Sequence, residues 1–256
     1  MLEVDSLAKR YGEVWALRDL SLTLAQGECL VLLGRNGAGK TTALRCMAGV
    51  VKPTAGCVKV DGLDAAEDAA GVRARVGLMP EVPGLYERMS ARAYLDYFGA
   101  IYGLGPDERR RRIDQLLDYF DLSSAGERWL GTFSKGMRQK VALIRATLHR
   151  PRLVLADEPT SALDPASARA AWRYLKELQA GGSALVICTH SMEEAESLGG
   201  RIGIMSGGYL LADGDFAQLR RRSGLKVRRE IRQLPTLQDI YLAIVGSELD
   251  EQAESA

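Results

Sequence analysis

Apolar and polar positions alternate in some parts of the chain and run together in others, and this pattern predicts a sheet with two kinds of strand. Residues 16–24 (ALRDLSLTL) alternate apolar and polar side chains, as an antiparallel strand with one solvent-facing side does. Residues 29–33 (CLVLL) are apolar throughout, which is typical of a strand buried on both faces. Further strands are expected over residues 2–4, 57–60, 76–79, 153–156 and 184–188, and a hairpin over residues 202–212.

Helical spacing of apolar residues is concentrated between residues 82 and 150. Ser90 is expected to cap a helix that runs to Tyr102, Pro106 to open a second, and residues 135–149 to form a third. Other helices are expected over residues 41–48, after the caps Asp164 and Asp215, after Ser191 in a capping-box pattern with Glu194, and over residues 236–245. We therefore expect a main domain over residues 1–222, with a helical subdomain at about 82–150, and a segment over 223–256 with one helix and a frayed acidic tail.

Composition is that of an ordinary globular protein. The 256 residues carry a net charge of +1, from 34 basic and 33 acidic side chains, so nothing in the charge indicates nucleic acid as a partner. The basic run at residues 109–112 is interpreted as a solvated helix face. No apolar stretch has the length of a signal peptide or a membrane span, and the four cysteines show no paired spacing. We expect a cytosolic protein with buried thiols, which would reach a membrane only through a partner.

Residues 34–42 (GRNGAGKTT) stand between the buried run at 29–33 and a predicted helix, and they have the spacing G-x-x-x-x-G-K-[ST] of a phosphate-binding loop. Glycines at 34, 37 and 39 permit backbone angles that turn successive amides toward an anion, and the helix dipole adds positive charge. Lys40 would contact the β- and γ-phosphates, and the Thr41 hydroxyl would hold Mg²⁺. The alternative is a glycine-rich turn before a helix.

A second set of polar residues follows the buried run at residues 153–156. Asp157 comes directly after it, where a carboxylate can bind Mg²⁺ directly or through water. Glu158 is one residue further along, where it could orient or deprotonate an attacking water. An ordinary acidic turn is the alternative, but the continuation with Pro159 and the SALD sequence at residues 161–164 favours the catalytic interpretation.

From about residue 2 to 220 the chain resembles the nucleotide-binding subunit of ATP-binding cassette (ABC) transporters. GRNGAGKTT is similar to the Walker A loop, and residues 153–164 (LVLADEPTSALD) to Walker B, catalytic glutamate and D-loop. The resemblance implies an α/β fold of the ABC type of P-loop NTPase, with a RecA-like core, an antiparallel β subdomain and an inserted α-helical subdomain. It also implies catalytic roles for Lys40, Glu158 and His190, the last as the switch histidine that senses the γ-phosphate. Tyr11 matches the aromatic residue that stacks on adenine, although a strand-end tyrosine would look the same.

Two motifs depart from the family's usual form. Residues 133–137 (FSKGM) stand where the family has the signature LSGGQ, with Ser134 and Gly136 retained and Lys135 and Met137 replacing a glycine and a glutamine. This form is similar to that of ABC-2-type exporters, including drug- and sodium-efflux ATPases. Glu81 stands where the γ-phosphate-sensing loop usually carries glutamine, so we expect it at the metal with Thr41 and Asp157, or else as a coupling residue that faces a membrane partner. The resemblance implies that ATP is bound by Tyr11, Gly34, Asn36, Gly37, Ala38, Gly39, Lys40, Thr41, Thr42, Ser134 and Gly136.

The expected function is that of an ATP-hydrolysing exporter subunit with ATP and Mg²⁺ as cofactors. Two copies would enclose two ATP molecules, each site pairing one copy's Walker residues with the other's signature. A separate membrane-spanning permease would receive the force through residues 81–102 and hold the subunit at the cytoplasmic face of the membrane. Two alternatives remain open: a soluble ABC ATPase that acts on ribosomes or DNA, and a nucleotide-binding module without turnover.

Overall fold

The computed structural model describes residues 1–224 and, further along, residues 237, 240, 241, 243 and 244. These last five residues are helical, as the predicted helix over residues 236–245 requires. The remaining residues of that helix and the predicted acidic tail lie outside the described part of the chain.

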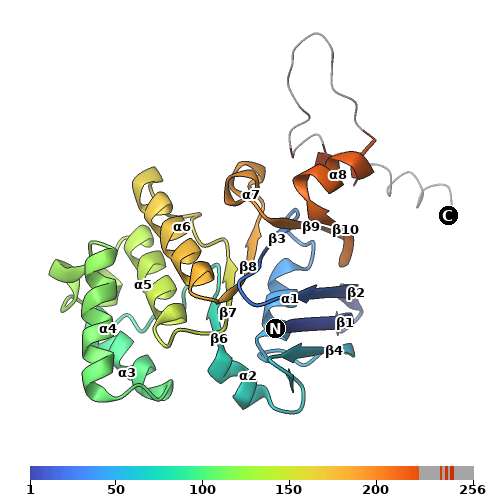
Figure 1. Cartoon of the computed structure of the whole chain (residues 1–256). Coiled ribbons are helices and arrows are strands. Elements are labelled where there is room, and N and C mark those ends of the chain that lie inside the picture. Colours follow the sequence, from blue (N-terminus) through green and yellow to red (C-terminus); the bar gives the residue numbers. More distant parts are fainter. Residues whose placement is uncertain (225–236, 238–239, 242, 245–256) are drawn as a thin grey trace, which may run out of the picture.

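Strands and helices alternate along most of the chain (Figure 1). The strands are β1 (Leu2–Tyr11), β2 (Val14–Leu24), β3 (Cys29–Leu33), β4 (Ala55–Val60), β5 (Leu63–Asp64), β6 (Val76–Met79), β7 (Leu153–Asp157), β8 (Ala184–Thr189), β9 (Arg201–Ser206) and β10 (Tyr209–Asp215). The helices are α1 (Lys40–Met47), α2 (Ala69–Arg75), α3 (Ala91–Ile101), α4 (Pro106–Tyr119), α5 (Lys135–Thr147), α6 (Pro165–Ala180), α7 (Met192–Leu198) and α8 (Phe216–Arg222), with 3₁₀ turns η1 (Ser123–Ala125) and η2 (Leu130–Thr132).

The described strands form one sheet in the order β5-β4-β1-β2-β10-β9-β3-β8-β7-β6. Its first part is antiparallel, and buried and exposed residues alternate along the second half of β2, which confirms the strand predicted there. β1 is longer than the strand predicted over residues 2–4. The register shifts after Val4 and Ser6 has a φ of 48°, so a bulge moves Leu7 out of phase with Leu2. The two-residue periodicity breaks at the bulge, which is why the sequence pattern ends the strand too early.

The second part of the sheet is parallel and buried. β3 pairs in parallel with β8 and β9, β8 with β7, and β7 with β6. Every residue of β3, β7 and β8 is buried, which confirms the prediction of strands covered on both faces. β9 and β10 form the predicted hairpin, and one parallel bridge between Tyr209 and Asp19 joins β10 to β2. The hairpin therefore connects the antiparallel and parallel parts.

The helices α3, α4 and α5 gather beyond the β6 edge, at the opposite end of the sheet from β4 (Figure 1). Their starts are those predicted: Ser90 caps α3, Pro106 opens α4 and Ser134 caps α5. α5 ends at Thr147, two residues before the predicted end, and Asp164 caps α6 as expected. The sequence pattern did not predict α2, because this short helix has a single fully buried residue, Val72.

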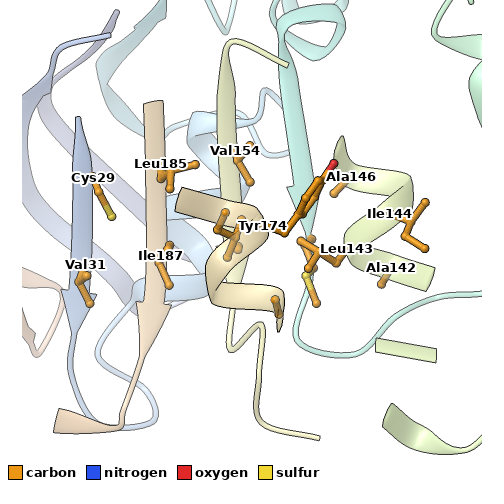
Figure 2. Packing of buried hydrophobic residues seen from close by; sticks show 14 of the residues in the cluster. Cys29, Val31, Ala142, Leu143, Ile144, Ala146, Val154, Tyr174, Leu185 and Ile187 are labelled. Carbon is orange, nitrogen blue, oxygen red and sulfur yellow. The ribbon is translucent and has the colours of Figure 1, made fainter. Parts of the chain in front are cut away.

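A large hydrophobic cluster joins α5 and α6 to one face of the parallel strands (Figure 2). Tyr174 of α6 is buried beside Leu143 and Ala146 of α5, and its hydroxyl donates to Thr147 Oγ1 at 3.0 Å. The C-terminal half of α5 is therefore held against α6 and the sheet. None of the helices that the structure describes is long and apolar enough to cross a membrane.

All four cysteines are free thiols, as predicted, and three of them are buried. Burial raises the pKa of Cys29 to about 12 and that of Cys46 to about 11, so both remain protonated at neutral pH. They act as small hydrophobic side chains in the core.

The parallel register gathers the predicted site residues at one edge of the sheet. Leu33 pairs with Thr189, and Asp157 pairs with Cys188. Because the carboxyl ends of these strands coincide, the glycine-rich loop after β3, Glu158 after β7 and His190 after β8 emerge side by side.

Candidate nucleotide-binding site

The glycine-rich loop wraps the space in front of α1. Gly37 and Gly39 have φ values of 85° and 102°, in the left-handed region that favours glycine. A Cβ at Gly39 would lie 2.5 Å from the carbonyl oxygen of Ala16, and one at Gly34 would lie 2.5 Å from that of Met205. The loop therefore needs glycine for space at residue 34, for backbone angle at residue 37 and for both at residue 39. Its amides and the start of α1 form the kind of anion cradle that the motif predicts.

Lys40 places a positive charge inside this loop. Its side chain is buried, and Nζ donates to the carbonyl oxygen of Gly34 at 2.5 Å and to that of Arg35 at 3.4 Å. Both contacts are to carbonyl oxygens of the loop itself, and an ammonium can exchange such acceptors for phosphate oxygens without leaving the loop.

Thr41 and Asp157 meet although 116 residues separate them in the sequence. The Thr41 hydroxyl donates to Asp157 Oδ2 at 2.6 Å. Burial raises the pKa of Asp157, the Thr41 hydrogen bond and the charges of Lys40 and Arg45 lower it, and the nearby charge of Glu81 raises it. A hydroxyl and a carboxylate side by side are oxygen ligands suited to Mg²⁺, which keeps several waters and phosphate oxygens in its shell.

Glu158 is held in an unusual backbone conformation. Its φ is 49°, a left-handed value that is uncommon outside glycine and costs about 1–3 kcal/mol. Its N–H donates to the Cys188 carbonyl at 2.9 Å, and its own carbonyl accepts from Gln139 Nε2 at 2.9 Å. The surrounding hydrogen bonds thus fix the direction in which the Glu158 side chain leaves the strand.

The carboxylate of Glu158 contacts His190. His190 Nδ1 lies 2.7 Å from Glu158 Oε1, and since an ionised carboxylate only accepts, the bond requires the ring proton on Nδ1. The Glu158 side chain is 8% exposed, whereas that of His190 is 62% exposed. The glutamate is therefore fixed in the interior, while the imidazole can turn toward a ligand above it.

A cleft of about 580 Å³ lies beside these groups, and among Lys40, Thr41, Asp157, Glu158 and His190 only His190 lines it. Its lining comes from the end of β3 with the glycine-rich loop, from the start of α7, and from residues later in the chain. These lining residues are Leu33, Gly34, Arg35, Asn36, Gly37 and Ala38, then His190 and Met192, and finally Ser206, Gly207 and Tyr241. Tyr241 was not predicted as a site residue, and no motif indicates it. It reaches the cleft because residues around it pack against α7, where the Leu237 N–H donates to the Glu196 carboxylate.

Tyr11 and Ser134 do not line this cleft. Tyr11 ends β1 with 46% of its surface exposed, and Lys9 Nζ lies 5.0 Å from its ring centroid. Ser134 is exposed at the start of α5, where its Oγ accepts from the Met137 N–H at 3.2 Å. Gly136 packs on the D-loop, since a Cβ there would lie 3.0 Å from the Ala162 carbonyl.

One prediction near the site was wrong. Ser191 caps α7 by accepting from the Glu194 N–H at 3.2 Å, but the Glu194 side chain does not return to Ser191 as a capping box requires. Its carboxylate accepts instead from the hydroxyls of Thr160 and Thr189. These two threonines, Gln139 and Glu194 are the contacts of the site that motif reading missed, because none belongs to a phosphate-binding pattern.

Residues 17–161 match the family described as ABC transporter. The chain belongs to the ABC transporter family. One relative, the ABC transporter ATP-binding protein NatA of Bacillus subtilis, is 38% identical over 86% of this chain and 91% of its own length. The daunorubicin resistance ATP-binding protein DrrA3 of Streptomyces coeruleorubidus is 36% identical over 87% of this chain and 71% of its own length.

Solved structures of ABC cassettes have the same fold. The ATP-binding subunit of an ABC transporter superposes with a TM-score of 0.88 at 31% identity, covering 96% of this chain and 99% of the other. The dimeric cassette MJ0796, bound to ADP and Pi after hydrolysis, gives a TM-score of 0.79 at 26% identity, covering 84% of this chain and 98% of the other. The predicted family and fold class are confirmed, and this ABC protein is an ATPase with ATP and Mg²⁺ as cofactors.

Proposed function

We propose that this ABC subunit powers an exporter of the ABC-2 type, as a homodimer that closes around two ATP molecules and drives a separate membrane-spanning permease. The observation that carries the proposal is the convergence of Lys40, Thr41, Asp157, Glu158 and His190 at one edge of the sheet. The relatives named for daunorubicin resistance and Nod factor export support the direction of transport. The subunit then works at the cytoplasmic face of the membrane through its partner.

Within one chain, each residue gathered at this edge of the sheet has a separate task. ATP is the substrate, and bound Mg²⁺ would neutralise part of the negative charge on its phosphates. Thr41 and Asp157 hold the metal, and Lys40 contacts the β- and γ-phosphates. Glu158 accepts the proton of the attacking water, and His190, held on Glu158 through Nδ1, presents its other ring nitrogen to the γ-phosphate. These residues favour transfer of the γ-phosphoryl group to water, because they position the water and place positive charge where negative charge develops in the transition state.

The glycine-rich loop and Tyr11 bind the rest of the nucleotide. Amides of the loop hold the phosphates, with Gly34, Asn36, Gly37, Ala38, Gly39 and Thr42 as its contributors. Tyr11 stacks on the adenine, for which its exposed ring at the end of β1 is suited. Glu81 lies close enough to Asp157 to raise its pKa, which supports a place beside the metal over a role in coupling alone.

Ser134 and Gly136 serve the ATP bound by the second copy. The start of α5 is exposed and offers unpaired amides to an anion, yet it does not line this chain's own cleft. In a two-fold dimer each copy presents the start of its α5 to the ATP bound by the other copy, so both ATP sites are completed in the same way.

Mixed dimers test this arrangement. Lys40→Ala and Ser134→Arg, each with Glu158→Gln added to block turnover, should fail to form ATP-trapped dimers alone and should form them when mixed. Only the mixture contains a site with an intact Lys40 and an intact Ser134. If both variants fold, and the Ser134→Arg chain still binds ATP, absence of trapped dimers in the mixture would refute the role of Ser134 in the partner's site.

The membrane partner docks on residues 81–102 and the neighbouring groove. Val82, Tyr97 and Ile101 are exposed apolar side chains there, at 79%, 48% and 59%. A groove of about 450 Å³ beside them is lined in part by Val50, Phe98 and Ile101. Such a surface fits an amphipathic helix of the permease.

Replacing Ile101 by arginine should leave the ATPase rate of the isolated subunit within twofold. It should abolish copurification with the co-expressed membrane-spanning permease and the stimulation of turnover by that permease. Unchanged copurification and stimulation would exclude this docking surface while leaving the ATPase assignment intact.

A further inference from the structure

The carboxylate of Glu194 joins the two loops that carry Glu158 and His190. Glu194 lies in the first turn of α7, and its Oε1 accepts from the Thr160 hydroxyl at 2.5 Å. Its Oε2 accepts from the Thr189 hydroxyl at 2.9 Å. Thr160 and Thr189 are 5% and 0% exposed, so the donor side of both hydrogen bonds is buried, which strengthens them.

The Thr189 hydroxyl has one proton and two carboxylates within reach. Glu194 Oε2 is 2.9 Å from the hydroxyl oxygen, and Glu158 Oε2 is 3.5 Å away. The Ser191 N–H donates to the same oxygen at 3.0 Å, so one of its two lone pairs is also engaged. A hydroxyl donates a single hydrogen bond, and the shorter distance assigns that proton to Glu194.

The acceptor of the Thr189 hydroxyl proton determines which oxygen of Glu158 remains available to a water. Glu158 Oε1 is occupied by His190 Nδ1 at 2.7 Å, which leaves Oε2 as the other acceptor of the carboxylate. If the Thr189 proton were given to Oε2, that hydroxyl would compete with the attacking water for the same oxygen. A general base needs an oxygen that can accept the proton of its water.

We propose that Glu194 is a positioning residue for ATP hydrolysis, which keeps the Thr189 hydroxyl proton away from Glu158 and so leaves Glu158 Oε2 open to the attacking water. The inference rests on the proposed role of Glu158 as the base. Glu194 itself does not touch the reacting atoms. Its contact with Thr160, two residues after Glu158, also fixes the loop in which Glu158 has its left-handed backbone.

Replacing Glu194 by methionine removes both acceptors and keeps a side chain of similar length. The Thr189 proton is then left with Glu158 as its acceptor. The expected result is an about 10- to 100-fold fall in kcat, part of what a general base contributes, with the Kd for ATP within twofold of wild type. Glu193→Met is the matched control, because Glu193 is the exposed neighbour in the same helical turn, and its kcat should change less than twofold.

A second substitution separates this role from a structural one. Thr189→Val removes the competing hydroxyl, so Glu194→Met combined with Thr189→Val should turn over faster than Glu194→Met alone. A merely structural role predicts no recovery, since the double variant also loses the hydrogen bond from the Ser191 N–H to the Thr189 hydroxyl. Thr189→Val by itself should keep kcat within about threefold, and this measurement stands even if Glu194→Met does not fold.

Three results would overturn the inference: an unchanged kcat in Glu194→Met, no recovery in the double variant, or a tenfold loss in Thr189→Val alone. Glu158→Gln is measured in parallel. If that variant is inactive while Glu194→Met is normal, only the inference on Glu194 fails. If Glu158→Gln remains active, the proposed role of Glu158 itself fails.

Discussion

The hydrogen bond from Gln139 to the backbone of Glu158 provides a quantitative prediction. Gln139 is 2% exposed, and its Nε2 donates to the Glu158 carbonyl at 2.9 Å, while the remaining donor to that oxygen, the Ser161 N–H, lies at 3.3 Å. Gln139→Leu keeps the volume and removes the donor. Leaving a buried carbonyl with one long bond costs about 1–3 kcal/mol. For a chain of this size each kcal/mol shifts Tm by about 2–4 °C, so Tm should fall by about 2–12 °C.

The same substitution should lower kcat, because the left-handed backbone of Glu158 loses one of its fixed partners. Gln179→Leu is the matched control: Gln179 Nε2 donates to the Gly27 carbonyl at 3.0 Å, before the start of β3 and so at the other end of that strand from the glycine-rich loop. Thermal unfolding and steady-state ATPase rates are measured on both. Both variants should lose stability, and only Gln139→Leu should lose more than about threefold in kcat. A Gln139→Leu protein with wild-type Tm and kcat would refute the reasoning.

Three further predictions concern the cleft. Lys40→Ala should raise the Kd for ATP by about 10- to 200-fold, because it removes a charge-assisted contact that contributes about 1.5–3 kcal/mol to binding. A fluorescent-nucleotide titration checks this. Asp157→Asn should raise the Tm of the nucleotide-free protein at pH 7 and abolish Mg²⁺-dependent turnover. Burial raises the pKa of Asp157, so the contribution of this carboxyl group to folding stability is lost as pH rises through that pKa. At neutral pH the charged carboxylate therefore lowers the free energy of unfolding, and the uncharged asparagine does not. Glu81→Gln should raise the Mg²⁺ concentration for half-maximal ATPase activity, and an unchanged Mg²⁺ dependence would favour a role in coupling.

Short-range chemistry accounts for the parts of the site that the sequence predicted. The glycines at residues 37 and 39 reveal the loop because few other residues adopt those backbone angles, and the run of buried residues before Asp157 identifies a central strand. Caps at Ser90, Asp164 and Asp215 fix helix starts within a few residues of sequence.

What the sequence could not predict depends on tertiary contacts. The capping-box pattern at Ser191 was misread because Glu194 has two buried hydroxyls within reach, and these come from loops that meet only in the folded sheet. Tyr241 enters the cleft through packing against α7, for which no local pattern exists. The bulge at Ser6 interrupts the alternation that would have extended β1 to Tyr11.

The most direct test of the account is the ATP turnover and ATP affinity of Glu158→Gln, measured on the same preparation. The Glu158 side chain is 8% exposed and contacts His190. Glutamine keeps the shape of the glutamate side chain but cannot act as a general base. The account predicts an ATP Kd within about threefold of wild type and a kcat lower by about 10²–10⁴-fold. Turnover within twofold of wild type, with ATP still bound, would contradict it.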